Sequence, residues 1–292
     1  MNGATFPFAW GTRTFVMGIL NVTPDSFSGD GLIADEIVEG TTAAALDQAR
    51  LFVEEGADIL DVGGESTRPG AQPVSAEEEI RRVVPVIRAL AAANLNAILS
   101  VDTSKASVAQ AALDAGAQWI NDVWGLRADP GMAGVAARAG VAVVLMHNRS
   151  KPANTELQQR LGGRYTGVKY THLIEDVKSE LLESVALAHA AGIADEAIIL
   201  DPGIGFGKTV EQSLELIDRL GEIRSLGYPM LLGPSRKSFI GYTLNLPPDQ
   251  RLEGTAAAVA IGIARGADIV RVHDVAAMVR VARMSDAILR LH

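Results

Sequence analysis

Residues 98–123 read ILSVDTSKASVAQAALDAGAQWINDV, and this stretch decides the fold. A short apolar run at residues 98–101 ends in an aspartate, and an Ala-rich helical pattern follows over residues 105–115. A Gly-Ala pair then precedes a second apolar run at residues 119–123. Because glycine is common at the left-handed position that ends a helix, the stretch is predicted to form a strand, a helix and a second strand.

The same unit repeats along the chain. Eight apolar runs are predicted to be strands, at residues 15–20, 59–62, 98–101, 119–123, 141–146, 198–201, 229–232 and 269–272. Helical patterns follow them, at residues 41–55, 76–93, 105–115, 131–139, 168–191, 210–220, 255–265 and 274–291. Strands that are apolar along their whole length indicate burial on both faces, as in a parallel sheet. We therefore predict an α/β fold, a single (β/α)8 TIM barrel over residues 1–292, with long, mobile loops after strands 1 and 2.

Two other arrangements were weighed against the barrel. A length of 292 residues also suits two domains, but no linker rich in Pro, Gly or Ser interrupts the repeats. A doubly wound open sheet also alternates strands and helices, and it normally carries a glycine fingerprint for phosphate after its first strand. Residues 21–31 read NVTPDSFSGDG at that place, a long polar loop without this fingerprint. The barrel is therefore favoured.

Composition narrows the class of protein. Lys and Arg number 26 against 35 Asp and Glu, and the resulting net charge of -9 argues against a general nucleic-acid binder. The absence of cysteine excludes disulfides, thiolate zinc sites and thiol nucleophiles, and it favours a reducing, cytoplasmic setting. No apolar run reaches the ~18 residues of a membrane span, and the N-terminal segment lacks the apolar core of a signal peptide. We expect no nucleic-acid or membrane partner, and an anionic ligand would need a local group of cations.

Polar side chains gather at the carboxyl ends of the predicted strands. They are Asn21, Asp61, Asp102, Asn121, Asp122, His147, Asp201, Ser235, Arg236, Lys237, Arg271 and His273. Any one of them could cap a helix or bond a loop, but a TIM barrel forms its active site at this rim. Arg271 and His273 alternate at a strand end, so both should project from one face and could bind phosphate. A salt-bridged arginine beside a structural histidine is the alternative interpretation.

The segment GIGFGKT at residues 203–209 is similar to a nucleotide-binding P-loop. That motif needs a glycine five positions before Gly207, where this chain has Pro202, which has no backbone N–H to donate. We interpret the segment as a flexible loop that lets Asp201 and Phe206 face a ligand. Another polar loop, GGESTRPG at residues 63–70, offers a hydroxyl and a cation that suit an anion.

Seven of these segments, in this order along the chain, resemble the dihydropteroate synthases. They are MGILNVTPDSFS at residues 17–28, DVGGESTRPG at 61–70, SVDTSK at 100–105, IND at 120–122, LDPGIGFGK at 200–208, SRKS at 235–238 and RVHD at 271–274. Each segment alone is a weak to moderate signal, whereas the series is highly specific. The resemblance implies that p-aminobenzoate is joined to 6-hydroxymethyl-7,8-dihydropterin pyrophosphate, with Mg²⁺ required, to give 7,8-dihydropteroate and pyrophosphate.

The resemblance also implies a role for individual residues. The pterin site would contain Asp102, Asn121, Asp201 and Lys237. The diphosphate site would contain Thr67, Arg271 and His273, with Asn21 in contact with Mg²⁺. The p-aminobenzoate site would contain Arg68, Pro69, Phe206 and Ser235. The mobile first loop would add Asp25, Phe27 and Asp30, although this chain reads SGDG at residues 28–31 where the family usually has SDGG.

Two other functions remain open beside the synthase. A related pterin-binding barrel could move a methyl group from a folate to a corrinoid, but it would have no use for a diphosphate site. A barrel that binds pterin without catalysis is the third hypothesis.

The synthase reaction needs no strong general base, because the aniline nitrogen of p-aminobenzoate is already neutral at pH 7. This agrees with the sequence, in which no Ser-His-Asp set can be assembled.

The last two helices suggest a homodimer. Residues 255–263 are small and apolar nearly all round, and residues 275–289 carry a broad apolar face. A helix without a polar face needs a partner, which is either the barrel itself or a second subunit. Since the family that the chain resembles is similar in this respect, we expect a two-fold dimer through the late helices.

Overall fold

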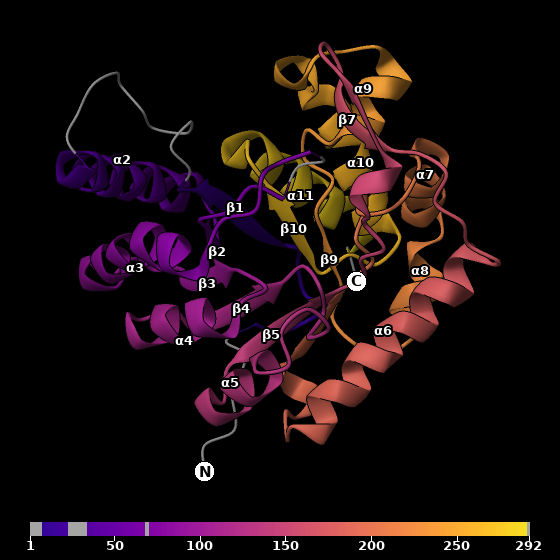
Figure 1. Ribbon diagram of the computed structural model, residues 1–292. Coiled ribbons are helices and arrows are strands. Elements are labelled where there is room, and N and C mark those ends of the chain that lie inside the picture. The colour runs from indigo at the N-terminus through magenta and orange to yellow at the C-terminus, as the bar shows by residue number, and fades with distance from the viewer. Residues whose placement is uncertain (1–7, 23–33, 68–69, 291–292) are drawn as a thin grey trace.

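The computed structural model describes residues 8–22, 34–67 and 70–290, with only the backbone of residues 34–39 (Figure 1). Its sheet contains eight parallel strands, which are β1 (Phe15–Asn21), β2 (Ile59–Gly63), β3 (Ile98–Asp102), β4 (Trp119–Asp122), β5 (Ala142–Met146), β8 (Ile198–Asp201), β9 (Leu231–Leu232) and β10 (Ile269–Val272). Their order is β8-β5-β4-β3-β2-β1-β10-β9. A parallel bridge between Leu200 and Met230 joins the first strand of this order to the last. The predicted (β/α)8 barrel is confirmed.

Helices follow the strands and surround the sheet in Figure 1. They are α2 (Ala34–Glu55), α3 (Ala76–Ala93), α4 (Ala106–Asp114), α5 (Met132–Ala139), α6 (Leu173–Ala190), α7 (Val210–Asp218), α8 (Leu220–Arg224), α9 (Ser238–Leu244), α10 (Leu252–Ala264) and α11 (Val275–Leu289). Short 3-10 helices lie at Pro152–Asn154, Asp195–Ala197 and Pro248–Gln250. The predicted helix at residues 210–220 is divided at Arg219, whose backbone leaves the helical region at φ -100° and ψ 18°.

A β-hairpin, helix α9 and all but the first residue of helix α8 were not predicted. An antiparallel hairpin, β6 (Thr155–Gln158) and β7 (Gly162–Tyr165), lies between β5 and α6 and packs against α9. Helix α9 itself follows the short strand β9. The prediction of a strand over residues 229–232 was two residues too long, because Pro229 has no N–H to donate and only its carbonyl pairs, with the N–H of Leu200.

One face of every strand points into the barrel. A cluster of buried side chains takes residues from all eight strands, and its members are Phe15, Met17, Ile59, Ile98, Trp119, Ala142, Val144, Ile199, Leu231 and Ile269. Phe8 packs against this cluster from below, with its ring 4.1 Å from that of Phe15 and 5.7 Å from that of Trp119. Among the described residues, the amino-terminal end of the barrel is therefore filled by apolar side chains, which leaves the carboxyl end as the place for a polar site.

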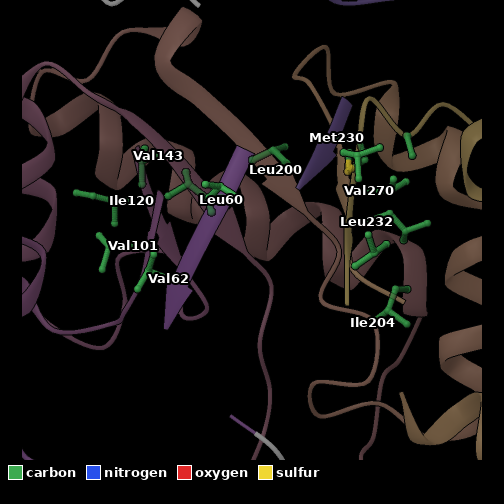
Figure 2. Close-up of a cluster of buried hydrophobic side chains, with 14 of the residues drawn as sticks. Leu60, Val62, Val101, Ile120, Val143, Leu200, Ile204, Met230, Leu232 and Val270 are labelled. Atoms are coloured by element: carbon green, nitrogen blue, oxygen red, sulfur yellow. The ribbon is translucent and has the colours of Figure 1, made fainter. Parts of the chain in front are cut away.

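The opposite face of the strands packs against the helices. Figure 2 shows members of this larger cluster, including Leu60, Val101, Val143, Leu200 and Val270, which alternate with the interior residues along their strands. Burial on both faces explains why the strands are apolar along their whole length.

Candidate active site

Polar side chains continue the inward-facing rows at the carboxyl end of the barrel. Residues two positions apart on a strand share a face. Each of five polar residues follows an interior apolar residue of its strand by two or four positions, and these are Asp61, Asp102, Asn121, Asp201 and Arg271. Because parallel strands end at the same rim, the alternation itself brings these side chains together.

Arg271 lies between two carboxylates at the centre of this group. Its Nε donates to Asp61 Oδ2 at 2.6 Å, and one Nη donates to Asp102 Oδ2 at 2.6 Å. Asn121 Nδ2 also donates to Asp61 Oδ2, at 2.9 Å. Asp61 is fully buried, so these bonds offset the cost of removing its charge from water.

One cation shared by two carboxylates leaves one negative charge uncompensated. Burial raises the pKa of Asp102 to about 7, the nearby Asp61 carboxylate adds to the rise, and Arg271 opposes it. Asp102 therefore changes its charge near neutral pH, and perturbed pKa values of this kind cluster at functional sites.

Asp201 and Lys237 form the second part of the site. The backbone N–H of Gly203 donates to Asp201 Oδ1 at 2.7 Å, and the positive φ of Gly203, 69°, allows this turn. Lys237 Nζ donates to the carbonyl of Ile204 at 2.5 Å and lies 4.5 Å above the centre of the Phe206 ring. Burial lowers the pKa of Lys237 to about 8, while Asp201 and Asp102 oppose that change. Burial also raises the pKa of Asp201.

Ser235 and His273 form a third contact at the same rim. Ser235 Oγ lies 3.0 Å from His273 Nδ1 and accepts the backbone N–H of His273 at 3.2 Å. Ser235 is 5% exposed. The two residues come from the loop after β9 and from the end of β10, which are neighbouring strands.

The structure thus brings together most of the residues that the sequence assigned to the site. Asp102, Asn121 and Arg271 meet through Asp61, while Lys237 joins Asp201 and Phe206. Asn21 is half-buried at the end of β1, and Thr67 is exposed. The remaining predicted residues lie outside the described part of the chain, and they are Asp25, Phe27, Asp30, Arg68 and Pro69.

Lys208 does not act as a P-loop lysine would. It is 2% exposed, and its Nζ bonds with His147 Nδ1 at 2.8 Å and with the carbonyl of Phe206 at 3.0 Å. His147 Nε2 in turn lies 3.1 Å from Glu180 Oε2. The amine therefore holds the loop at residues 203–209 through buried hydrogen bonds, and it is not directed at a ligand. His147, which the sequence left open, contributes to this anchor.

Sequence reasoning missed two contributors. It noted Asp61 at a strand end but gave it no role, although Asp61 binds both Arg271 and Asn121. The signal was present, because Asp61 follows Ile59 in the same inward row as the other site residues. The buried role of Lys208 had no comparable signal, since the loop that turns its amine inward depends on contacts with His147 and Phe206.

Comparison with known proteins identifies the family. The profile of the family described as pterin binding enzyme matches residues 17–273. A dihydropteroate synthase of Clostridium beijerinckii is 51% identical over 284 residues, which cover 97% of this chain and 97% of that protein. The chain belongs to the dihydropteroate synthase family.

Two further proteins support this membership. The dihydropteroate synthase of Bacillus subtilis is 50% identical over 277 residues, covering 95% of this chain and 89% of that protein. The crystal structure of the Clostridium difficile synthase in the presence of pteroic acid superposes with a TM-score of 0.86 at 46% identity, covering 97% of this chain and 99% of that one. The resemblance inferred from the seven sequence segments is confirmed.

Proposed function

We propose that this chain joins p-aminobenzoate to 6-hydroxymethyl-7,8-dihydropterin pyrophosphate and releases pyrophosphate. The observation that carries the proposal is the convergence of Asp102, Asn121, Asp201, Lys237 and Arg271 at one end of the barrel, in a chain of this family. Family membership gives the reaction class, and the arrangement of these five residues accounts for each part of the reaction.

Recognition of the pterin follows from the types of residue present. A pterin presents a fixed edge of amino, ring N–H and carbonyl groups. A buried carboxylate can accept two parallel N–H bonds, which suits Asp201, and an amide matches a mixed donor and acceptor edge, which suits Asn121. Because Asp61 holds Asn121 and Gly203 holds Asp201, both groups are oriented before the ligand binds.

The chemical step is a dissociative substitution. The bond between the pterin methylene carbon and the diphosphate oxygen breaks first, and its electron pair leaves with the diphosphate. The ionised Asp102 carboxylate stabilises the methylene cation that forms on the electron-rich dihydropterin. The neutral aniline nitrogen of p-aminobenzoate then forms the new C–N bond and loses its proton to water.

The departing diphosphate needs positive charge. Thr67, Arg271 and His273 are the residues that we assign to it. Three carboxylates, of Asp61, Asp102 and Asp201, face two cations, of Lys237 and Arg271. The buried amine of Lys208 also interacts with Asp201, but burial lowers the pKa of Lys208 well below its usual value and disfavours its charged form. The inner site therefore carries a net negative charge when Lys208 is neutral and the other five groups are ionised. The protein alone is therefore poorly matched to a diphosphate.

A magnesium ion that arrives with the diphosphate would correct this mismatch. Among the residues that the structure describes, no three His, Asp or Glu side chains form a metal site. Mg²⁺ often uses one or two protein ligands together with substrate phosphates and waters, and the amide oxygen of Asn21 fits such a role. When bound, the ion would neutralise charge on the leaving diphosphate.

p-Aminobenzoate would bind beside Lys237. The ammonium group of Lys237 above the Phe206 ring offers a cation for the carboxylate and a flat apolar surface for the benzene ring. Ser235 lies in the same loop as Lys237, and we assign it to the p-aminobenzoate site together with Arg68 and Pro69. Asp25, Phe27 and Asp30 of the first loop, which lie outside the described residues, are further candidates for contact with the substrates.

A pyrophosphate-release assay with both substrates tests the function. Release that needs both substrates and Mg²⁺, and that Asp201→Asn abolishes while the fold persists, is the expected result. A barrel that only binds pterin would bind without release. A methyltransferase would show no release but would transfer a methyl group from a methylated folate to a corrinoid. Either outcome would reject the synthase.

The remaining proposals concern the setting of the enzyme. We propose that residues 1–292 act as one domain, that the substrates are its small-molecule partners, and that two copies form a homodimer through the late helices. None of the helices in the described ranges is both long and apolar enough to cross a membrane. The cytoplasmic location expected from the cysteine-free sequence belongs to the same proposal.

A further inference from the structure

Arg251 is a buried cation whose hydrogen bonds, among the residues that the structure describes, all go to backbone carbonyls. It is 2% exposed and lies directly before α10. Its Nη1 donates to the carbonyl of Arg236 at 2.9 Å, and its Nη2 donates to the carbonyl of Leu161 at 2.9 Å. Nε and Nη2 both donate to the carbonyl of Leu246, at 3.1 and 3.0 Å. In the described part of the chain no carboxylate forms a salt bridge with it, and burial lowers its pKa.

Helix α9 is shaped to admit this guanidinium. A Cβ atom on Gly241, in the middle of α9, would lie 2.1 Å from an Nη of Arg251. Glycine inside a helix and a buried arginine without an acidic partner are both unfavourable locally. Features that break local rules in this way are expected at functional or strained sites.

The turn held by Arg251 carries two residues of the proposed site. Arg236 adopts a left-handed backbone with a φ of 55°, which is costly for a residue with a side chain. Its carbonyl is bound by Arg251, its N–H donates to Thr255 Oγ1 at 3.1 Å, and its own guanidinium pairs with Asp274. The residues on either side of this turn are Ser235 and Lys237.

The same guanidinium also holds the hairpin. The carbonyl of Leu161, which accepts a hydrogen bond from Arg251, lies in the turn between β6 and β7. The Tyr242 hydroxyl of α9 donates to the carbonyl of Gly162 at 3.2 Å and adds a second contact with this hairpin. Leu157, at the other edge of the hairpin, lies against Gly70, in the loop after β2. Arg251 is thus the point at which the hairpin, α9 and the turn at Arg236 are tied together.

We propose that Arg251 is a positioning residue, which holds the left-handed turn at Arg236 so that Ser235 and Lys237 face the substrates. This inference rests on the proposed function. If the turn relaxes, Lys237 leaves the place between the Ile204 carbonyl and the Phe206 ring, and both substrates lose a contact. A purely structural Arg251 would affect unfolding alone.

Four variants separate these roles. Arg251→Met removes the clamp with an apolar chain of similar length, and Arg251→Lys keeps the charge without the planar fork of donors. Thr255→Val removes the second bond to the turn. Arg160→Met is the matched control, because Arg160 is an exposed arginine that binds the hairpin to Asn245 without touching the turn.

We expect the first three variants to raise KM for both substrates, with kcat/KM falling about 10- to 100-fold for Arg251→Met and less for the other two. The measurements are made well below each melting temperature, with the circular dichroism spectrum as a check of the fold. Arg160→Met should keep the wild-type constants. If Arg251→Met fails to fold, Arg251→Lys and Thr255→Val decide the question.

The alkaline limb of the kcat/KM profile against pH is a second readout. A variant that only lowers the free energy of unfolding would leave this limb in place. The groups that interact with Lys237 are Asp201, Asp102, Arg271 and the buried amine of Lys208, together with the Ile204 carbonyl and the Phe206 ring. A displaced Lys237 regains water, so the limb should move to higher pH in Arg251→Met.

The outcomes distinguish the two proposals. If the wild type releases no pyrophosphate, the proposed function fails. If the wild type is active and the folded Arg251 and Thr255 variants keep wild-type KM values and an unmoved alkaline limb, the positioning role is wrong. Amide hydrogen exchange at residues 235–238 tests the positioning role independently of any activity assay. Faster exchange there in Arg251→Met would support the role, and unaltered exchange would oppose it.

Discussion

At the scale of single residues, two groups of the site have pKa values that burial shifts toward neutral pH, one upward and one downward. The pKa of Asp102 is raised to about 7 by burial, and that of Lys237 is lowered to about 8 by burial. The proposed reaction uses the ionised carboxylate and the protonated amine. We therefore expect kcat/KM to rise as Asp102 loses its proton near pH 7 and to fall as Lys237 loses its proton near pH 8, which gives a narrow optimum.

The acidic limb has a structural cause that a variant can isolate. Asp61→Asn removes a charge that raises the pKa of Asp102, and it leaves Arg271 to pair with Asp102 alone. The acidic limb of the kcat/KM profile should move to lower pH. Asp218→Asn, which removes an exposed carboxylate paired with Arg265, serves as control. A limb that stays in place in Asp61→Asn would show that Asp102 does not control it.

Lys237 is expected to serve both substrates. Lys237→Ala removes the ammonium group that lies between the Ile204 carbonyl and the Phe206 ring. Hydrogen bonds to charged groups are worth ~1.5–3 kcal/mol, so kcat/KM should fall about 10- to 100-fold, with KM raised for each substrate. Steady-state kinetics with Lys151→Ala, a change at an exposed lysine, provides the comparison. Equal constants for Lys237→Ala and the wild type would refute this role.

The sequence predicted which residues meet but not how they pair. Asp102, Asn121 and Asp201 were identifiable because each stands at the end of an apolar strand, and Lys237 because it lies in the loop that follows one. The choice of Asp61 as the partner of Arg271 joins residues 210 positions apart, and it depends on the distances across the closed barrel. No local pattern encodes such a choice, and the same limit applies to the carbonyl clamp of Arg251.

At the scale of elements, the loop at residues 203–209 is shaped by close backbone approach. Gly207 has a φ of 59°, and a Cβ there would lie 2.2 Å from the carbonyl carbon of Arg149. Gly192 has a φ of 90°, but a Cβ there would meet no atom within 4 Å. Substitution of Gly192 therefore tests backbone strain alone, whereas substitution of Gly207 tests backbone strain together with a steric clash.

We expect Gly192→Ala to lower the free energy of unfolding by ~1–3 kcal/mol, which is the cost of a left-handed alanine. Gly207→Ala should cost ~1–3 kcal/mol more, since the backbone must shift, and it should also reduce activity by moving Phe206. Urea unfolding and pyrophosphate release measure the two effects. Equal losses of stability in the two variants would mean that the contact with Arg149 is not tight.

The hairpin that the sequence did not predict escapes detection for a physical reason. The strands of the hairpin at residues 155–165 are short, and Leu157 is 66% exposed. A ribbon that buries little apolar surface leaves no periodic pattern to detect. The barrel strands were found within one or two residues because burial on both faces requires apolar residues at every position.

At the scale of the whole molecule, the net charge of -9 is compatible with anionic substrates only through local groups. The structure shows that even the inner site holds more carboxylates than cations, with Asp61, Asp102 and Asp201 facing Lys237 and Arg271. In the proposed function, attraction of the diphosphate is therefore assigned to Mg²⁺ and to the rim residues. For this reason, removal of Mg²⁺ should weaken diphosphate binding far more than binding of p-aminobenzoate.

The proposed dimer is the last property of the whole molecule that the structure makes testable. Helices α10 and α11 pack against each other, and they leave Ile261, Met284 and Ile288 exposed by 48%, 62% and 63%. Complete burial of an exposed side chain of this size contributes ~1.5–3 kcal/mol, so covering these partly exposed side chains would contribute part of that amount each toward the cost of association. The wild type should sediment at twice the chain mass.

The variant that combines Met284→Glu with Ile288→Glu should sediment as a folded monomer, because two carboxylates would have to lose water in the interface. Leu187→Glu is the matched control, since Leu187 is an apolar side chain of α6 that is 43% exposed on a different helix, and it should remain a dimer. A wild type that is monomeric at micromolar concentration would reject the dimer. A dimer that survives the double change but not Leu187→Glu would place the interface on α6 and leave the apolar face of the late helices to the barrel.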